Sequence, residues 1–84
     1  MKPIKFSKHA LSYKEKRGFT ESEVEDTIGN SEWLNAELGR LECKKDFEFN
    51  NIWNSKFYKT KQIKPVFVEE EDDIVVVTVY TYFF

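Results

Sequence analysis

The clearest structural signal in the chain is an alternation of apolar and charged residues at positions 40–49. Apolar side chains occupy odd positions, at Leu41, Cys43, Phe47 and Phe49. Charged side chains occupy the even positions, and Lys45 is the single exception on the apolar side. Period-two alternation is typical of a β-strand with one solvated face. We therefore expect a strand over residues 40–49 whose charged side faces water.

A second strand signal is the β-branched run from Ile74 to Tyr80. Such a run indicates a central strand that is covered on both faces or nearly so. Alternation divides its side chains between two faces. One face, which helices are expected to cover, carries Val75, Val77 and Val79, and the open face carries Thr78, Tyr80 and Tyr82.

Residues 7–28 predict two short helices. Ser7 is placed to cap the first helix, and Gly18 is suited to end it. Thr20 and Glu23 have the spacing of a capping box, which begins the second helix. Helices this short are not stable alone. We therefore expect both to pack on a sheet.

The other segments show weaker patterns. Residues 32–38 fit either a helical turn or an irregular strand, and Pro65 favours an edge position or a bulge in its strand. Further expected elements are strands at 3–6, from Phe57 and at 63–69, a loop at 50–55, and turns at 59–62 and 71–73. The order predicts a single α+β domain over residues 1–84, with two short N-terminal helices on one face of a mostly antiparallel twisted sheet.

Charge and composition narrow the function classes. Net charge alternates in blocks, at +5 for residues 1–17, −6 for 18–39, +4 for 40–64 and −5 for 65–84. The blocks either neutralise one another across the fold or leave a basic functional face. A lone cysteine and a lone histidine can form neither a disulfide nor a zinc site.

We accordingly expect no metal and no other cofactor. A single cysteine suits a reducing cytoplasm, which is the expected location. No apolar run is long enough to span a membrane, and the first residues lack the apolar stretch of a signal peptide.

Candidate RNA chemistry lies on the expected open face. Metal-independent RNA cleavage needs a base for the 2′-hydroxyl, cations for the charge on the phosphate and an acid for the leaving oxygen. Candidates for these roles are Arg40, Lys44, Tyr80 and His9. Candidates for holding phosphates or stacking on bases are Arg17, Lys56, Lys59, Lys61, Lys64 and Tyr82. The alternative is a solvated strand face whose lysines prevent aggregation.

Several of these residues also have structural interpretations. His9 fits a neutral side chain that packs on the last strand and bonds to the backbone. Arg17 fits a cation at the end of the first helix that pairs with the acidic start of the second. The aromatic residues at the end of the chain need a cover, and the first helix, a second copy in a homodimer or an antitoxin segment would provide it. These residues are Tyr80, Tyr82, Phe83 and Phe84.

Two stretches of the chain resemble the small prokaryotic family called domain of unknown function 4258. The matching residues are His9-Ala10, Arg17-Gly18, Thr20 and Val24 in the opening stretch, and Tyr58-Lys59 and Val76-Val77-Thr78-Val79-Tyr80 in the closing one. The resemblance implies a fold similar to the RelE/ParE toxins, in which two N-terminal helices cover an antiparallel sheet. Many of those toxins are ribosome-dependent mRNA endonucleases, others act on DNA gyrase, and an antitoxin neutralises them. Because the family has no settled activity, the resemblance assigns no catalytic residue.

The hypothesis that follows is a toxin-like RNA-binding protein of a toxin–antitoxin system and, in its stronger form, a metal-independent endoribonuclease. The alternatives are a non-catalytic protein-interaction module with the same fold and a gyrase-directed toxin. The expected partners are a cognate antitoxin, RNA or the ribosome, and a second copy of the chain. No membrane partner is expected.

Overall fold

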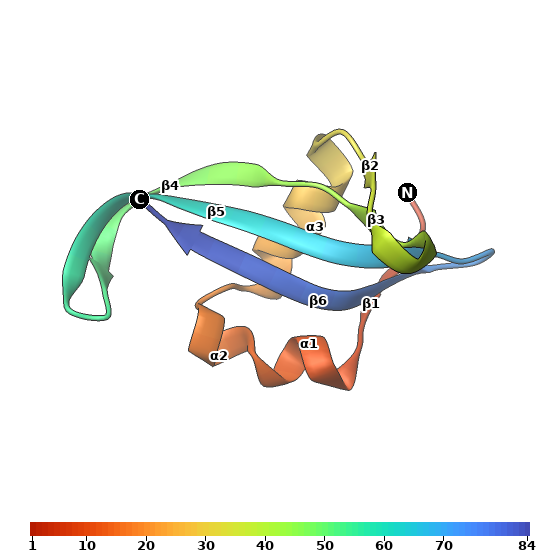
Figure 1. Cartoon of the computed structure of the whole chain (residues 1–84), viewed down its shortest axis with the longest axis horizontal. Coiled ribbons are helices and arrows are strands. Elements are labelled where there is room, and N and C mark those ends of the chain that lie inside the picture. The colour runs from red at the N-terminus through yellow and green to blue at the C-terminus, as the bar shows by residue number, and fades with distance from the viewer.

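Six strands form one twisted sheet, and helical segments lie behind it and along one side (Figure 1). The computed structural model describes residues 1–84. The helical segments are α1 (Lys8–Ser12), α2 (Lys14–Arg17), α3 (Glu21–Asn30) and the 3₁₀ turn η1 (Glu37–Gly39). The strands are β1 (Ile4–Phe6), β2 (Leu34–Asn35), β3 (Leu41–Glu42), β4 (Lys45–Trp53), β5 (Lys56–Glu69) and β6 (Ile74–Phe83).

The sheet has the order β1-β6-β5-β3-β2, and β4 pairs with β5 beyond the end of β3. β1 runs parallel to β6, and the other pairs are antiparallel. The predicted α+β class is therefore confirmed, with N-terminal helices against a mostly antiparallel sheet. Residues 32–38, which the sequence left open, contain β2 and the start of η1.

The capping signals are confirmed, but the first predicted helix is two helices. Ser7 Oγ accepts a hydrogen bond from the Ala10 backbone N–H at 3.0 Å, and Thr20 forms its capping box. The first helix breaks at Tyr13 into α1 and α2. Gly18 follows α2 with φ of 73°, the left-handed conformation that glycine adopts readily.

The core lies between α3 and the back face of the sheet. Val24, Thr27 and Ile28 of α3 are buried, and α3 packs against β5. The other buried apolar residues are Ala10, Phe19, Cys43, Ile63, Phe67, Ile74, Val76 and Val79. Burial raises the pKa of the Cys43 thiol to about 11. Cys43 is therefore a small apolar core residue, as expected, and not a reactive thiol.

A β-bulge shifts the alternation of β6 by one residue. Val66 of β5 pairs with Thr78, whereas the next residue, Phe67, pairs with Val76. Val77 is therefore an extra residue without a partner, and the side chains beyond it change faces.

The bulge changes which residues of β6 are buried. The buried apolar residues are Ile74, Val76 and Val79. The prediction of one buried face formed by Val75, Val77 and Val79 is wrong, because alternation does not continue across an extra residue. Tyr80 and Tyr82 remain on the other face, where their side chains are 42% and 46% exposed.

β4 and β5 form one long hairpin, so the predicted loop at 50–55 and turn at 59–62 are wrong. The strands are joined by a two-residue turn at Asn54 and Ser55, whose φ angles are 51° and 68°. Positive φ at both positions is the geometry of a tight hairpin turn. Asn50, with φ of 45°, lies at a bulge within β4. The asparagines therefore mark a bulge and a turn rather than the ends of a loop.

Pro65 lies inside β5, next to the break between β3 and β4. The Cys43 backbone N–H donates to the Pro65 carbonyl at 3.4 Å. Proline has no N–H to return a bond, so the ladder is interrupted there. The predicted strand at 40–49 is split at this point, and Pro65 occupies neither an edge strand nor a bulge.

Most ion pairs join charge blocks of opposite sign. On the helix-covered side of the sheet, Lys45 pairs with Asp26 at 2.8 Å and Lys61 pairs with Glu23 at 2.7 Å. Both acids belong to α3, which explains why a lysine interrupts the apolar side of β4. Elsewhere Lys2 pairs with Glu69, Lys5 with Asp73 and Lys14 with Glu21. Neutralisation between blocks therefore accounts for much of the charge pattern.

We expect Gly18→Ala to destabilise the protein more than Gly39→Ala. The two glycines have φ of 73° and 71°, so either variant incurs a left-handed penalty of about 1–2 kcal/mol. A Cβ on Gly18 would lie 2.6 Å from the indole of Trp53, whereas nothing lies within 4 Å of one on Gly39. Overpacking adds about 1–3 kcal/mol. Urea unfolding measures the difference, and equal losses in the two variants would contradict the Trp53 contact.

We also expect stability to fall in acid through Asp26. The hydrogen bond from Lys45, assisted by one from Asn30, lowers the pKa of Asp26 below 3.8. A carboxyl with a lowered folded-state pKa stabilises the protein above its unfolded-state pKa, and this contribution disappears as the pH falls through the folded-state value. The free energy of unfolding should therefore decrease below about pH 4. In Lys45→Met, the free energy of unfolding measured in urea should depend less on pH in this range. An unchanged pH profile in this variant would refute the contribution of Asp26.

Candidate functional site

Apart from the short turn η1 at one end, no helix covers the face of the sheet opposite α3 (Figure 1). Register pairs place Lys64 beside Tyr80 and Gln62 beside Tyr82. We call this surface the open face, and its residues are Glu42, Lys44, Asp46, Gln62, Lys64, Val66, Thr78, Tyr80 and Tyr82. It is the surface on which the sequence predicted binding chemistry.

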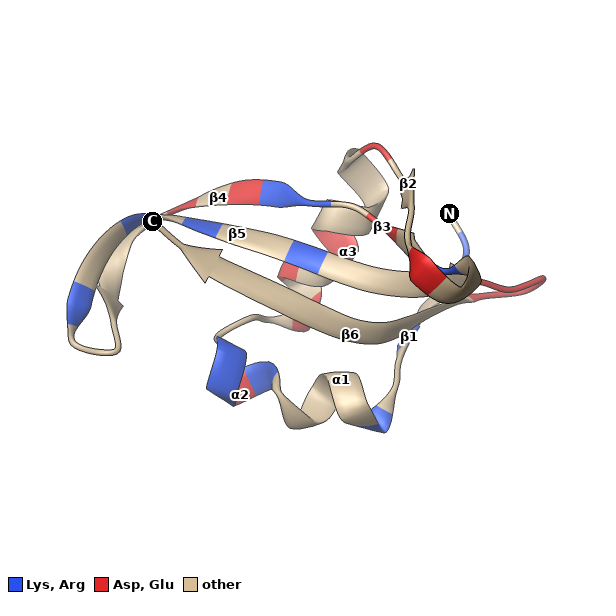
Figure 2. Ribbon diagram, viewed as in Figure 1, with Lys and Arg blue, Asp and Glu red and all other residues tan.

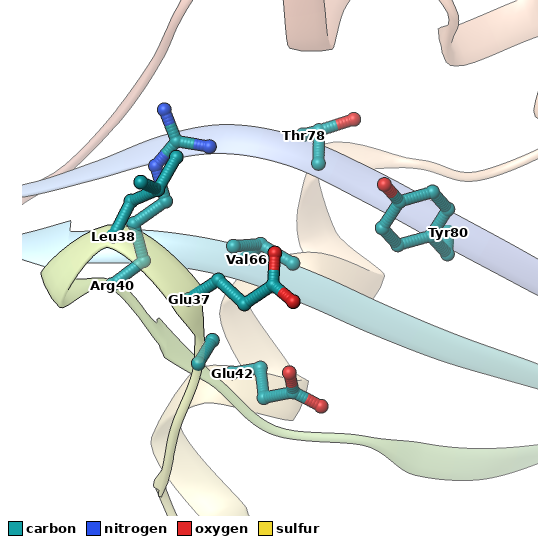
Figure 3. A pocket seen from close by; sticks show the side chains of 8 residues that line it. Glu37, Leu38, Arg40, Glu42, Val66, Thr78 and Tyr80 are labelled. Carbon is teal, nitrogen blue, oxygen red and sulfur yellow. The ribbon is translucent and has the colours of Figure 1, made fainter.

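A hollow of about 270 Å³ opens on this face beside η1. It is lined by Ala36, Glu37, Leu38, Arg40, Glu42, Val66, Thr78 and Tyr80. In Figure 3 the Glu37 carboxylate and the Tyr80 hydroxyl point toward the space above Val66. Pockets for whole small molecules usually measure about 300–1,000 Å³. This hollow is better matched to one base or one phosphate group.

The backbone of η1 places Glu37 and Arg40 at the pocket. Leu38 and Gly39 follow each other with φ of 60° and 71°. The Ala36 N–H donates to the Arg40 carbonyl at 2.8 Å, and the Arg40 N–H donates to the Glu37 carbonyl at 3.2 Å. A leucine in the left-handed region costs about 1–3 kcal/mol. The turn thus keeps a strained residue while it holds an acid and a cation over the sheet.

Arg40 is the unpaired cation of the pocket. The residue is half-buried, and its guanidinium takes part in none of the ion pairs of the protein. Lys64, by contrast, lies 3.0 Å from Glu42, and this hydrogen bond raises the pKa of the Lys64 ammonium. Lys64 therefore stays protonated at neutral pH and is unsuited to act as a base. Arg40 remains available to an anion.

Arg17 anchors α2 to β6 at the side of the open face. Its Nη1 donates to Thr78 Oγ1 at 3.1 Å and to the Val79 carbonyl at 2.9 Å. The expected pairing of Arg17 with the acidic start of the next helix is wrong. That role belongs to Lys14, whose ammonium lies 3.2 Å from Glu21.

A stack of side chains continues from Arg17 in both directions. The Arg17 guanidinium lies 4.0 Å from the centre of the Tyr13 ring and 5.3 Å from that of Tyr80. The His9 ring lies 5.0 Å from Tyr13 at the outer end. His9 is exposed, so it does not have the buried position on the last strand that its structural interpretation required.

Comparisons of the chain with models of protein families, with curated proteins and with solved structures found no match. No group of three or more His, Cys, Asp or Glu side chains gathers where it could hold a metal ion. None of the helices has the length and apolar character needed to cross a membrane. The geometry of the open face is therefore the basis for a functional proposal.

All the candidate residues from the sequence except Lys61 fall into three groups. Arg40 and Tyr80 line the pocket, and Lys44 and Tyr82 lie on the same face. Arg17 and His9 belong to the stack at its side, and Lys56 and Lys59 lie on the β4–β5 hairpin.

Lys61 is separated from the other candidates. It lies on the opposite face of β5, where it is 8% exposed. Its ammonium donates to the Gly18 carbonyl at 3.1 Å and pairs with Glu23. The prediction that Lys61 holds phosphate beside the open face is therefore wrong, because its ammonium is buried on the other face and already paired.

The sequence did not identify Glu37, Glu42 or Thr78 as site residues. Thr78 shares a face with Tyr80 by alternation, and that signal was sufficient to find it. Glu42 was assigned only to a solvated strand face. Glu37 has no signal of its own, because the irregular segment around it has no periodicity.

Proposed function

We propose that the protein binds single-stranded RNA on its open face, as the toxin-like member of a cytoplasmic toxin–antitoxin pair. The main support is the exposed pair Tyr80 and Tyr82 on one side of a central strand. Lys64 is the register partner of Tyr80, and Arg40 lines the same pocket. Exposed rings beside cations on a sheet are suited to stack unpaired bases and hold phosphates.

The groups in the pocket also suit cleavage of the bound strand. The Glu37 carboxylate takes the proton of a 2′-hydroxyl, whose oxygen then bonds to the adjacent phosphorus. The bond from phosphorus to the 5′-oxygen breaks, and the Tyr80 hydroxyl protonates that oxygen. A 2′,3′-cyclic phosphate and a 5′-hydroxyl result, and water returns the proton from Glu37 to Tyr80. Arg40 stabilises the negative charge on the phosphate oxygens.

The arrangement of the helices adds support for kinship with the RelE/ParE toxins. In this chain, as the resemblance implies, N-terminal helices pack against a mostly antiparallel sheet whose other face is open. A cognate antitoxin that neutralises the protein is accordingly its proposed protein partner, and RNA, free or on the ribosome, is its proposed target.

We expect Tyr80→Ala and Arg40→Ala each to weaken RNA binding by about tenfold or more, because a stacked base contributes about 1–3 kcal/mol. Fluorescence anisotropy with a labelled single-stranded RNA measures the affinity. Tyr80→Phe keeps the ring, and Lys8→Ala removes an exposed lysine outside the open face, so both should bind normally. Unchanged affinity in Tyr80→Ala would sink the proposed site.

A further variant separates binding from cleavage. Glu37→Gln should bind RNA and fail to cleave it, as should the wild-type protein with RNA that lacks the 2′-hydroxyl at the cut site. Normal binding with no cleavage by the wild type would reduce the proposal to RNA binding alone.

A protein-interaction module is the second candidate, and the exposed side of η1 favours it. Leu38 is 84% exposed and Leu34 is 51% exposed. Two leucines that contribute little to the core fit an apolar partner surface. The protein to test as the partner is the product of any small reading frame beside the gene, since an antitoxin is encoded there in such systems.

We expect Leu34→Ser, which alters an exposed leucine outside the pocket, to weaken binding to such an antitoxin by about tenfold while the affinity for RNA stays constant. Isothermal titration calorimetry measures the affinity for the antitoxin, and fluorescence anisotropy measures the affinity for RNA. Full antitoxin affinity in Leu34→Ser would exclude this leucine surface as the docking site. Inhibition of purified DNA gyrase in a supercoiling assay, with no binding to RNA, would favour the gyrase-directed alternative.

A further inference from the structure

The end of the β4–β5 hairpin, from residue 49 to residue 68, carries positive charge only. It projects past the end of β6 and curls toward α2 (Figure 1). No acidic residue occurs between Glu48 and Glu69. Lys56 and Lys59 are exposed on the hairpin. Figure 2 shows basic residues on the hairpin and α2 at one end of the molecule, and the acidic β5–β6 turn at the other.

The hairpin also presents an apolar pair that nothing covers. Ile52 and Phe57 are directly paired across the strands, and they are 58% and 52% exposed. Their neighbours Trp53 and Tyr58 point the other way and contact Phe83, with ring centroids 4.9 Å and 5.7 Å from it. The inner side of the hairpin thus holds it in place, while the outer side is left for a partner.

The hairpin is joined to the open face through α2. The Trp53 indole lies against Gly18 at the end of α2, where a Cβ would approach within 2.6 Å. The preceding residue, Arg17, reaches Tyr80 on the open face. Lys16, on the same short helix, is exposed. Cations and aromatic rings therefore continue from the pocket to the hairpin.

We propose that the outer side of the hairpin, together with Lys16, is a second contact for the RNA strand that occupies the open face. This inference rests on the proposed function. Lys16 and Lys59 bind phosphates, and Phe57 stacks on an unpaired base. Continuity with the pocket and the absence of acid favour a polyanion that reaches both surfaces. At about 3.3 Å per residue, β5 runs about 33 Å from Val66 to Lys56, so a short RNA cannot bridge them.

The test compares labelled single-stranded RNAs of about 4 and about 16 nucleotides, which span the usual site sizes. Phe57→Ser and Lys59→Ala should weaken binding of the long RNA by about tenfold and several-fold and leave the short RNA unaffected. Lys59→Ala should also reduce the slope of log K against log salt concentration by about 0.7. Lys8→Ala, which removes an exposed lysine elsewhere, should change neither the affinity for either RNA nor the salt slope.

The outcomes separate this inference from the proposed function. If Arg40→Ala weakens binding of both RNAs and the hairpin variants weaken binding of neither, RNA binding on the open face stands and the second contact is refuted. If the hairpin variants weaken both lengths equally, the hairpin is not a separate contact. If no RNA binds, both proposals fail. Phe57-dependent binding to vesicles containing anionic lipid, without an effect on RNA, would assign the hairpin to a membrane surface and overturn the inference.

Discussion

The bulge at Val77 is the constraint on which the rest of the structure depends. Ile74 and Val76 enter the core before it, and without the extra residue alternation would bury Tyr80 and expose Val79. With it, one strand both completes the core and presents its tyrosines to solvent.

The amino-terminal helices hold this bulge in place. The Ser7 N–H donates to the Val76 carbonyl at 3.0 Å, and Ser7 Oγ donates to the Val77 carbonyl at the same distance. Arg17 then binds the Val79 carbonyl and the Thr78 hydroxyl. β1 pairs with β6 only as far as Val76, so the carbonyls on that edge of β6 beyond it have no strand partner and need such donors. The side chains that cap and end the first helices therefore also determine which side chains reach the open face.

The charged residues of this protein divide into those that form ion pairs and those that are left free for a ligand. The acids of α3 pair with two lysines of the covered face, and the lysines near the amino terminus pair with the acidic β5–β6 turn. The cations that remain without a carboxylate partner include Arg40, Lys44, Lys56 and Lys59. They lie on or beside the surface where exposed aromatic rings gather. A net charge of −2 thus conceals a local excess of positive charge.

Local chemistry in the amino-acid sequence was enough for the helix caps, for the glycine that ends α2 and for the alternation of faces over residues 40–49, because each depends on neighbours within a few residues. It did not predict that this segment is divided into β3 and β4. It was also enough for the tyrosine face of β6 and the α+β class. The bulge, the continuous β4–β5 hairpin and the position of Lys61 depend on pairing between distant strands. The pocket likewise exists only because η1 folds over β5 and β6, so Glu37 and Arg40 meet Tyr80 through contacts that no local pattern records.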